Sequence, residues 1–262
     1  MTVSPAPVEP GNPSYAEPST LARVEDFCQY LQQPAHTSIG FCVDGTGSLR
    51  LYSSVSPAVH YVNQCATLEA LLPELQGKLP LEELYCLAIT LVASVFQLSH
   101  TPWLQREWTK KNIAFLRVSN NVPLGVDIKY PYLVRDFFQM ASRPDQQPSK
   151  ATSTDCSKLL TLAIILLEIN FGKPIEQMRR SEDHRNDLKD VEKADLHTAE
   201  QWYKAERPRL SSGFSKAILT GLQEYLNPDA NLNNPEYCAD IKDKMLQPLE
   251  DEMQFVVFGP PR

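Results

Sequence analysis

The sequence predicts an α+β fold that is predominantly helical. Two stretches with helical apolar spacing predict the helices: "PLEELYCLAITLVASVFQLSH" (80–100) and "LLTLAIILLEINFGKP" (159–174). The β part rests on "SIGFCVDGTGSLRLYSS" (38–54), in which short apolar stretches flank an Asp-Gly pair. This arrangement is typical of a β-hairpin, because glycine supplies the positive φ that tight turns need. We therefore expect a helical body with a small N-terminal hairpin.

The composition is that of a globular chain that can bury a large core. Of the 262 residues, 42% are hydrophobic and 9% aromatic, which suits one big domain or two small ones. The formal charge of −7 and the pI near 5.3 argue against nucleic acid or an anionic membrane as the main partner, since both need clustered Lys and Arg. The most apolar stretch, 159–169, is shorter than the roughly 20 residues of a membrane span, so none is expected.

The cytosol is the expected compartment. The first twenty residues lack the positive start and the apolar block of a signal peptide. The six cysteines are scattered, with no C-x-x-C pair and no His at ligand spacing, so neither a zinc site nor an iron–sulfur site is expected. Free thiols in a reducing compartment follow from this usage.

The N-terminal part divides into a tail and the start of a single domain. Residues 1–18 carry five prolines and few large apolar groups, which predicts a disordered tail, and the domain is expected over 19–262. Residues 20–32 have apolar side chains at helical spacing behind a capping Thr20, and predict a short helix. The G-T-G sequence at 45–47 is also half of a nucleotide-binding fingerprint, but a further glycine and a directly following helix are missing.

Helices are expected through much of the remaining chain. Residues 66–76 predict a brief amphipathic helix, and 80–100 a longer one with a broad apolar face. Residues 159–174 are apolar nearly all round, which is typical of a helix buried on every side, and Gly172 supplies its stop. We expect this segment to be the central core helix.

The other segments are more polar. Residues 122–133 have β-branched residues and prolines that suit irregular extended chain, and the charged stretch 176–209 predicts solvated helix and loop with Trp202 and Tyr203 docked on one side. Two further helices and an apolar finish are expected at 213–226, 235–253 and 256–258.

Several ionisable side chains are interpreted as solvated surface. The histidines His184 and His197 lie in the charged stretch and are expected to be neither catalytic nor metal-binding. The basic pairs Lys110-Lys111 and Arg179-Arg180 are possible anion contacts, but the favoured interpretation is ordinary solvated charge.

The order of hairpin, long apolar helix, polar loop, all-apolar helix and peripheral helices resembles the C-terminal lobe of a protein kinase. More closely, the chain is similar to a kinase-like domain of unknown function that is common in filamentous fungi, often behind helical prion-inhibition or HeLo-type modules. The closer resemblance is carried by "LAITLVASVFQLSHTPWLQREWTKKNIAFL" (87–116) and "LLTLAIILLEINFGKPIE" (159–176), and it extends from about residue 20 to the end. It implies a kinase-like C-lobe with no complete N-lobe.

The resemblance places a degenerate catalytic loop at "QREWTKKN" (105–112). Kinases have H-R-D-x-K-x-x-N there, in which the carboxylate orients the substrate hydroxyl and the Asn ligates magnesium. The spacing is kept, with Glu107 five residues before Asn112 and with Gln105 and Arg106 before it. Glu is one methylene longer than Asp, and misplacing a catalytic group by about 1 Å can cost roughly 100-fold in rate.

The loop residues therefore have structural interpretations. Asn112 is expected to tie down backbone amides rather than to bind magnesium, and Arg106 to act as a tether. Thr109 stands where kinases place a phosphate-contacting Lys, although Lys110 is adjacent.

The other kinase parts are missing, altered or ambiguous. Residues 1–77 contain no lysine, so the strand lysine that pairs with the phosphates has no candidate. Asp127 lies near the expected distance for a D-F-G aspartate but is followed by Ile-Lys, and the "DFF" at Asp136 lies too far along unless the loop is longer. Counting back from Glu168 puts Lys158 where a kinase has Asp.

Three function classes follow. The favoured one is a catalytically inactive kinase-like interaction or regulatory module with a protein partner and no cofactor, by family context in fungal self-recognition or immune signalling. The alternative is an atypical phosphotransferase that binds Mg-ATP with Glu107, Asn112 and Asp127. The third is a purely structural helical domain whose partner contacts come from 176–209.

Overall fold

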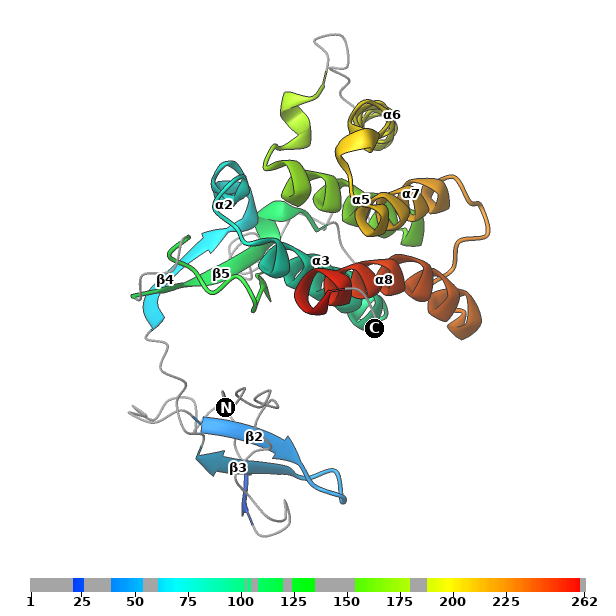
Figure 1. Ribbon diagram of the computed structural model, residues 1–262. Coiled ribbons are helices and arrows are strands. Elements are labelled where there is room, and N and C mark those ends of the chain that lie inside the picture. The colour runs from blue at the N-terminus through cyan, green and yellow to red at the C-terminus, as the bar shows by residue number, and fades with distance from the viewer. Residues whose placement is uncertain are drawn as a thin grey trace, which may run out of the picture. The chain divides into compact units, whose positions relative to one another are not determined.

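The computed structural model describes most of the chain, and its residues fall into two compact units, Met1–His60 and Tyr61–Arg262 (Figure 1). Each unit is presented by itself. The described residues are 21–25, 39–53, 61–101, 103–104, 108–119, 124–134, 154–179 and 188–259. The expected tail at 1–18, together with Asp136, Arg180 and His184, lies outside these ranges and stays a prediction.

The first unit contains the expected hairpin. Strands β2 (Ile39–Val43) and β3 (Leu49–Ser53) pair antiparallel, and β1 (Ala22–Arg23) adds to the other edge of β3, in the order β1-β3-β2. The turn is closed by a backbone hydrogen bond of 2.9 Å from Gly47 N to Asp44 O. Gly47 has a φ of 79°, the left-handed conformation that a three-residue hairpin loop requires.

Asp44 organises this turn from a buried position. Its Oδ1 accepts hydrogen bonds from the backbone N–H of Thr46 and Ser48 and from the Thr46 hydroxyl, while its Oδ2 lies 2.6 Å from Arg50 Nε. The G-T-G amides are thus partly satisfied by the turn's own carboxylate. This use favours the hairpin interpretation of 45–47 over a phosphate-binding loop.

The prediction of a helix over 20–32 is wrong at Ala22–Arg23, near its expected start. Ala22–Arg23 form strand β1, and Val24 N donates to Leu49 O at 2.9 Å. Helical apolar spacing over so few residues was outweighed by pairing with the open edge of β3, which satisfies backbone groups. Residues 26–38 lie outside the described part of the chain.

The second unit is mostly helical, which confirms the expected α+β class. Its elements, in chain order, are β4 (Tyr61–Thr67), α2 (Leu68–Leu75), α3 (Leu81–Leu98), η2 (Lys110–Asn112), β5 (Ile113–Val118), β6 (Tyr132–Leu133), α5 (Asp155–Phe171), η3 (Ile175–Gln177), α6 (Leu188–Glu206), η4 (Arg207–Arg209), α7 (Ser212–Tyr225) and α8 (Pro235–Phe258). Figure 1 shows α7 alongside α5, and α8 alongside α3.

This unit also contains a small antiparallel sheet in the order β4-β5-β6. Strands β4 and β5 are elements that the sequence patterns did not predict. Their register pairs Thr67 with Ala114, and β5 pairs Ile113 with Leu133 of β6. Thr67 then caps α2 by accepting from Ala70 N, so the sheet leads directly into the first helix.

Helix α5 is the central core helix, as expected. Its side chains are buried on every face, among them Leu159, Leu162, Leu166 and Leu167, and it ends at the predicted Gly172. It packs against α3, α6 and α7. The core therefore assembles around this one helix.

The charged stretch 176–209 contains α6, in which Trp202 and Tyr203 are buried as expected. His197 is exposed and bonds to Gln201 of the same helix. The apolar finish at 256–258 is the last turn of α8 rather than a separate segment, and Val256 and Val257 are exposed.

Helix α3 follows Pro80, which is its N-cap rather than its expected first residue. By length and composition alone, with a mean hydropathy of 1.5, α3 could cross a membrane. The core helix of a soluble domain passes the same test, and α3 packs against α5 and α8. The expected lack of a membrane span stays a prediction.

Close contact between α5 and α7 makes Gly221 a test of the core. A Cβ there would lie 2.8 Å from Ala163 Cβ and 2.9 Å from Leu159 O. We expect Gly221→Val to lower the free energy of unfolding by about 1–3 kcal/mol through overpacking, measured by urea denaturation. Thr220→Val, at the neighbouring position, is the control and should stay within about 0.5 kcal/mol. Equal stability of the two variants would contradict this packing.

Asp44 makes the hairpin sensitive to acid. The Thr46 hydroxyl, and then Arg50, hold the pKa of Asp44 well below its ordinary value of 3.8. Because the folded pKa is the lower one, Asp44 stabilises the fold above pH 3.8, and this contribution is lost as the pH falls through the folded value. Carboxyl NMR titration should give a midpoint below 3.8, and Thr46→Val should move it upward. A midpoint of 3.8 in the wild type would refute the turn geometry.

Candidate functional site

The loop that resembles a kinase catalytic loop ends in the short helix η2. Thr109 caps η2: its hydroxyl accepts from Lys111 N, and its own N–H donates to Asn112 Oδ1 at 2.9 Å. The two residues thus form a reciprocal capping box. The side chain of Asn112 therefore holds a backbone amide, which is the role expected of a structural residue.

Asn112 also joins η2 to strand β6. Its backbone O accepts from Val134 N at 2.7 Å, and its side-chain Nδ2 lies 3.4 Å from Val134 O. Ile113, the next residue, begins β5 and pairs with Leu133. The side chain and backbone of one residue thus fix where strand β5 begins.

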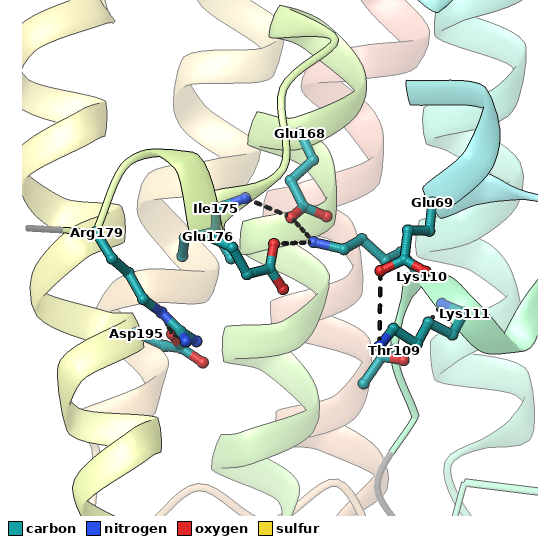
Figure 2. Close-up of polar contacts among 9 residues, drawn as sticks. All are labelled: Glu69, Thr109, Lys110, Lys111, Glu168, Ile175, Glu176, Arg179 and Asp195. Carbon is teal, nitrogen blue, oxygen red and sulfur yellow. Dashed lines mark hydrogen bonds and ion pairs between the residues drawn. The ribbon is translucent and has the colours of Figure 1, made fainter. Parts of the chain in front are cut away.

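Lys110 is the central charge of the site (Figure 2). Its Nζ lies 2.5 Å from Glu168 Oε1 and 2.5 Å from Glu176 Oε2. The side chains of Lys110 and Glu168 are only 6% and 1% exposed, whereas that of Glu176 is 52% exposed. The favoured interpretation of Lys110 as solvated charge was wrong: a buried carboxylate on the core helix draws this cation inward, since an unpaired charge there is costly.

Glu168 has a second partner in the turn after α5. Its Oε1 also accepts from Ile175 N at 2.8 Å. Figure 2 shows this carboxylate between Lys110 and the backbone of Ile175. One side chain of the apolar core helix thus anchors both the η2 loop and the η3 turn.

The pKa values in this cluster follow from burial and pairing. Burial opposes the charge on Lys110, but its bonds to Glu168 and Glu176 prevail and raise its pKa. Burial raises the pKa of Glu168, and Lys110 offsets this only in part. For Glu176, burial opposes the charge, but the Lys110 bond, a backbone hydrogen bond and the charges of Lys110 and Arg179 together outweigh it and lower the pKa. One buried cation therefore serves two carboxylates of unequal acidity.

Two further charge pairs lie around the cluster, one exposed and one half-buried (Figure 2). Lys111 is 68% exposed and lies 3.7 Å from Glu69 Oε1. Arg179 pairs with Asp195 through its Nε at 3.0 Å, so this half of the Arg179-Arg180 pair is engaged within the chain. Lys110 and Lys111, although adjacent, thus have opposite environments.

Asp127 is held by a tyrosine. Tyr61, the first residue of β4, donates its hydroxyl to Asp127 Oδ2 at 2.6 Å, and this bond raises the pKa of Tyr61 to about 12. Asp127 N donates in turn to Leu116 O. Asn112 and Asp127 thus have different partners, Thr109 and Val134 for Asn112 and Tyr61 for Asp127. Gln105, Arg106 and Glu107 lie outside the described residues, so the joint use of Glu107, Asn112 and Asp127 stays a prediction.

Lys158 makes a second buried tether, at the other end of α5. Its Nζ lies 2.8 Å from Asp155 Oδ1 and 3.2 Å from Ser99 O. The other oxygen of Asp155 accepts from Leu232 N at 2.8 Å. The residue found where a kinase has Asp therefore joins the end of α3 to the start of α5.

The cysteines and acidic side chains of the described ranges form neither a metal site nor a disulfide. No group of three or more His, Cys, Asp or Glu there could hold a metal ion. Cys42, Cys65, Cys86, Cys156 and Cys238 are free thiols, and Cys28 lies outside those ranges.

These features define a mostly helical α+β domain with internally paired charges at a loop-to-core junction. The chain matches the family model described as "Domain of unknown function (DUF7580)" over residues 13–255. Because this match covers most of the chain, the protein belongs to that family. The search of curated proteins gave no match.

The buried charge pair predicts a large and pH-dependent effect. Lys110→Met leaves Glu168 buried without its cation, and we expect a loss of about 3–5 kcal/mol in the free energy of unfolding at pH 7, measured in urea. Without Lys110 the pKa of Glu168 should rise further. Lowering the pH then neutralises the Glu168 carboxyl and removes the cost of its buried charge. The loss should therefore shrink as the pH falls toward 5 and grow as it rises.

Two further variants are the controls for this experiment. Lys111→Met removes the exposed neighbour and should cost less than about 1 kcal/mol. The double variant Lys110→Met/Glu168→Gln keeps an acceptor for Ile175 N and should recover much of the loss. If Lys110→Met and Lys111→Met are equally stable, the buried cluster is refuted.

Proposed function

We propose that the protein is a catalytically inactive, kinase-like interaction or regulatory module that acts in the cytoplasm through a protein partner. The observation that carries this proposal is the use made of Asn112. Its Oδ1 accepts from Thr109 N at 2.9 Å and from Thr109 Oγ1 at 3.3 Å. An amide oxygen has two lone pairs, so magnesium would have to displace bonds that hold η2 together.

The other candidate ligands support the same proposal. The Asp127 carboxylate accepts the Tyr61 hydroxyl, and the Lys110 ammonium is committed to two carboxylates. The lysine-free stretch 1–77 offers no phosphate anchor. Phosphoryl transfer depends on cations positioned around the phosphates. A domain whose lysine and metal-ligating side chains are bonded to other residues of the same chain is poorly equipped for it.

The kinase-like part of the proposal rests on the resemblance of the loop and of the core helix, and the order of α3, the η2 loop and α5 along the chain supports it. The same resemblance suggests a fungal origin and a role in self-recognition or immune signalling, by analogy of fold rather than of site. The alternative, a Mg-ATP-dependent phosphotransferase with Glu107, Asn112 and Asp127, predicts nucleotide binding and is separable by experiment.

Thermal unfolding with and without Mg-ATP tests the proposal. A nucleotide bound at about 100 times its Kd would add roughly 2.7 kcal/mol of stability and raise Tm by several degrees. We expect no such rise in the wild type. Asn112→Ala should lose about 1 kcal/mol from the lost cap, equally with and without nucleotide.

Lys111→Ala is the matched control, because it changes an exposed η2 residue without touching the cap, and it should unfold like the wild type. A Mg-ATP-dependent rise in the wild type that disappears in Asn112→Ala and Asp127→Ala would overturn the proposal in favour of the phosphotransferase.

A further inference from the structure

A groove of about 360 Å³ opens between the end of α3 and the start of α8, two helices that lie side by side (Figure 1). Its apolar lining comes from Phe96 of α3 and from Pro235, Cys238 and Ala239 of α8. Its volume lies within the range of about 300–1,000 Å³ that ligand-binding pockets occupy. The groove shares no residue with the charge cluster at η2.

Much of this lining is open to solvent. The lining residues Gln97, His100, Asn233, Pro235 and Ala239 are exposed. A pocket for a small molecule normally encloses its ligand and buries about 70–90% of the ligand surface. Walls as exposed as these instead suit a segment of polypeptide that lies across the groove and keeps one side in water.

Lys242 gives the groove a positive charge without an acidic neighbour on its helix. Lys244, two positions further on, pairs with Asp240 at 2.6 Å. The positions one helical turn from Lys242, where such a partner would stand, hold Cys238, Ala239, Met245 and Leu246. Lys242 is half-buried and has no ion pair among the described residues.

Two contacts place polar groups at this lining. Burial raises the pKa of the Cys238 thiol, and the charge of Lys242 opposes this rise, so the ammonium lies near a second lining residue. His100 Nδ1 lies 3.0 Å from Asn233 Oδ1, and because that oxygen can only accept, Nδ1 is the donor. The other ring nitrogen of His100 can then donate to a carboxylate when the ring is protonated.

The groove is therefore a positive site on an acidic chain. The formal charge of the chain is −7, yet none of the described residues that line the groove is acidic. The charge of Asp155 also acts on Cys238, but this carboxylate is bonded to Lys158 and to Leu232 N. Apolar walls beside a lysine complement an apolar side chain that has a carboxylate next to it.

Two other occupants are less compatible with the charges. A flat anionic membrane would meet the exposed carboxylates of Glu236, Asp240 and Asp243 on the same part of α8. Two copies of a chain with a charge of −7 repel each other. A partner of a different chain therefore fits the groove better than a lipid surface or a second copy.

We propose that the groove between the end of α3 and the start of α8 is the partner-binding site of the domain: it receives an apolar side chain of a partner polypeptide, and an adjacent Asp or Glu of that segment pairs with Lys242. This inference rests on the proposed function as a protein-interaction module, because it names the chemistry of the partner contact. His100, on the opposite wall, is the second contact for that carboxylate.

The test is an NMR titration of the full chain with three capped tetrapeptides, followed through the backbone N–H signals of residues 238–242. Asp-Leu-Leu-Asp, which carries a carboxylate on either side of two leucines, should shift these signals, with a Kd near 1 mM as the scale for so small a ligand. Asn-Leu-Leu-Asn has the same shape without the charge and should bind about threefold more weakly. Asp-Gly-Gly-Asp keeps the charge without the apolar side chains and should give no shift at roughly 10 mM.

Three variants sharpen the result. Lys242→Gln should weaken binding of Asp-Leu-Leu-Asp about threefold and leave that of Asn-Leu-Leu-Asn unchanged, so the preference for charge disappears. Lys244→Gln removes the neighbouring lysine outside the groove and should bind both peptides like the wild type. Ala239→Leu fills the groove at an exposed helical position, and should abolish binding while circular dichroism stays that of the wild type.

The proposal is overturned if Asp-Leu-Leu-Asp gives no shift, if the wild type binds the charged and neutral peptides equally, or if Lys242→Gln and Lys244→Gln lose the same affinity. Self-association in sedimentation that Ala239→Leu removes would assign the groove to a second copy. Binding to vesicles of phosphatidylcholine and phosphatidylserine that Ala239→Leu removes would assign it to a membrane. None of these results alters the Mg-ATP measurement, so the proposed inactive module and this binding site fail separately.

Discussion

The pairing of Lys110 with Glu168 is the constraint on which the loop-to-core junction depends. Glu168 is the acidic residue in an otherwise apolar stretch of α5, and its side chain is 1% exposed. A carboxylate at that depth needs a cation and further donors, and it obtains them from Lys110 Nζ and Ile175 N. For Lys110 to reach inward, η2 must turn toward α5, and the Thr109–Asn112 capping box fixes that turn. Strand β5 then begins at the next residue, so the charge pair and the capping box together determine where β5 begins.

This arrangement gives neighbouring loop residues separate tasks. In η2, Lys110 enters the core, Lys111 stays at the surface near Glu69, and Asn112 closes the cap. Three consecutive side chains thus point to three environments, as the roughly three-residue turn of a 3₁₀-helix allows. The kinase-like spacing of the loop therefore coexists with an internal use of its polar groups, and under the proposed function the spacing reflects folding rather than chemistry.

Much of the fold could be predicted because its signals are local. Periodicity identified α3 and α5, and the Asp-Gly turn identified the β2–β3 hairpin. Strand β5 was missed because Ile113, Ala114 and Phe115 are all buried and show no alternation, and β1 was missed because its pairing with β3 is set about 30 residues away. The burial of Lys110 depends on Glu168, 58 positions later, so its own surroundings gave no sign. A signal did exist: an acidic residue inside an all-apolar helix demands a cation from elsewhere in the chain.

Two buried lysine contacts anchor both ends of the segment that leads into η2. Lys158 holds Ser99 O, and Glu168 holds Lys110, so both ends of the segment from 99 to 110 are anchored on α5. The anchors are ten residues apart on the helix, or about 15 Å at 1.5 Å per residue. The connecting chain advances eleven residues and could span roughly 36 Å when extended, more than twice the distance. Its ends are therefore fixed on the core helix by a hydrogen bond from Lys158 to a backbone carbonyl and by the Lys110–Glu168 ion pair, and the length of the segment exceeds what this gap requires. Under the proposed function, we expect the fold to restrict substitution at Lys110, Glu168 and Lys158 more than at the positions to which the kinase resemblance assigns chemistry.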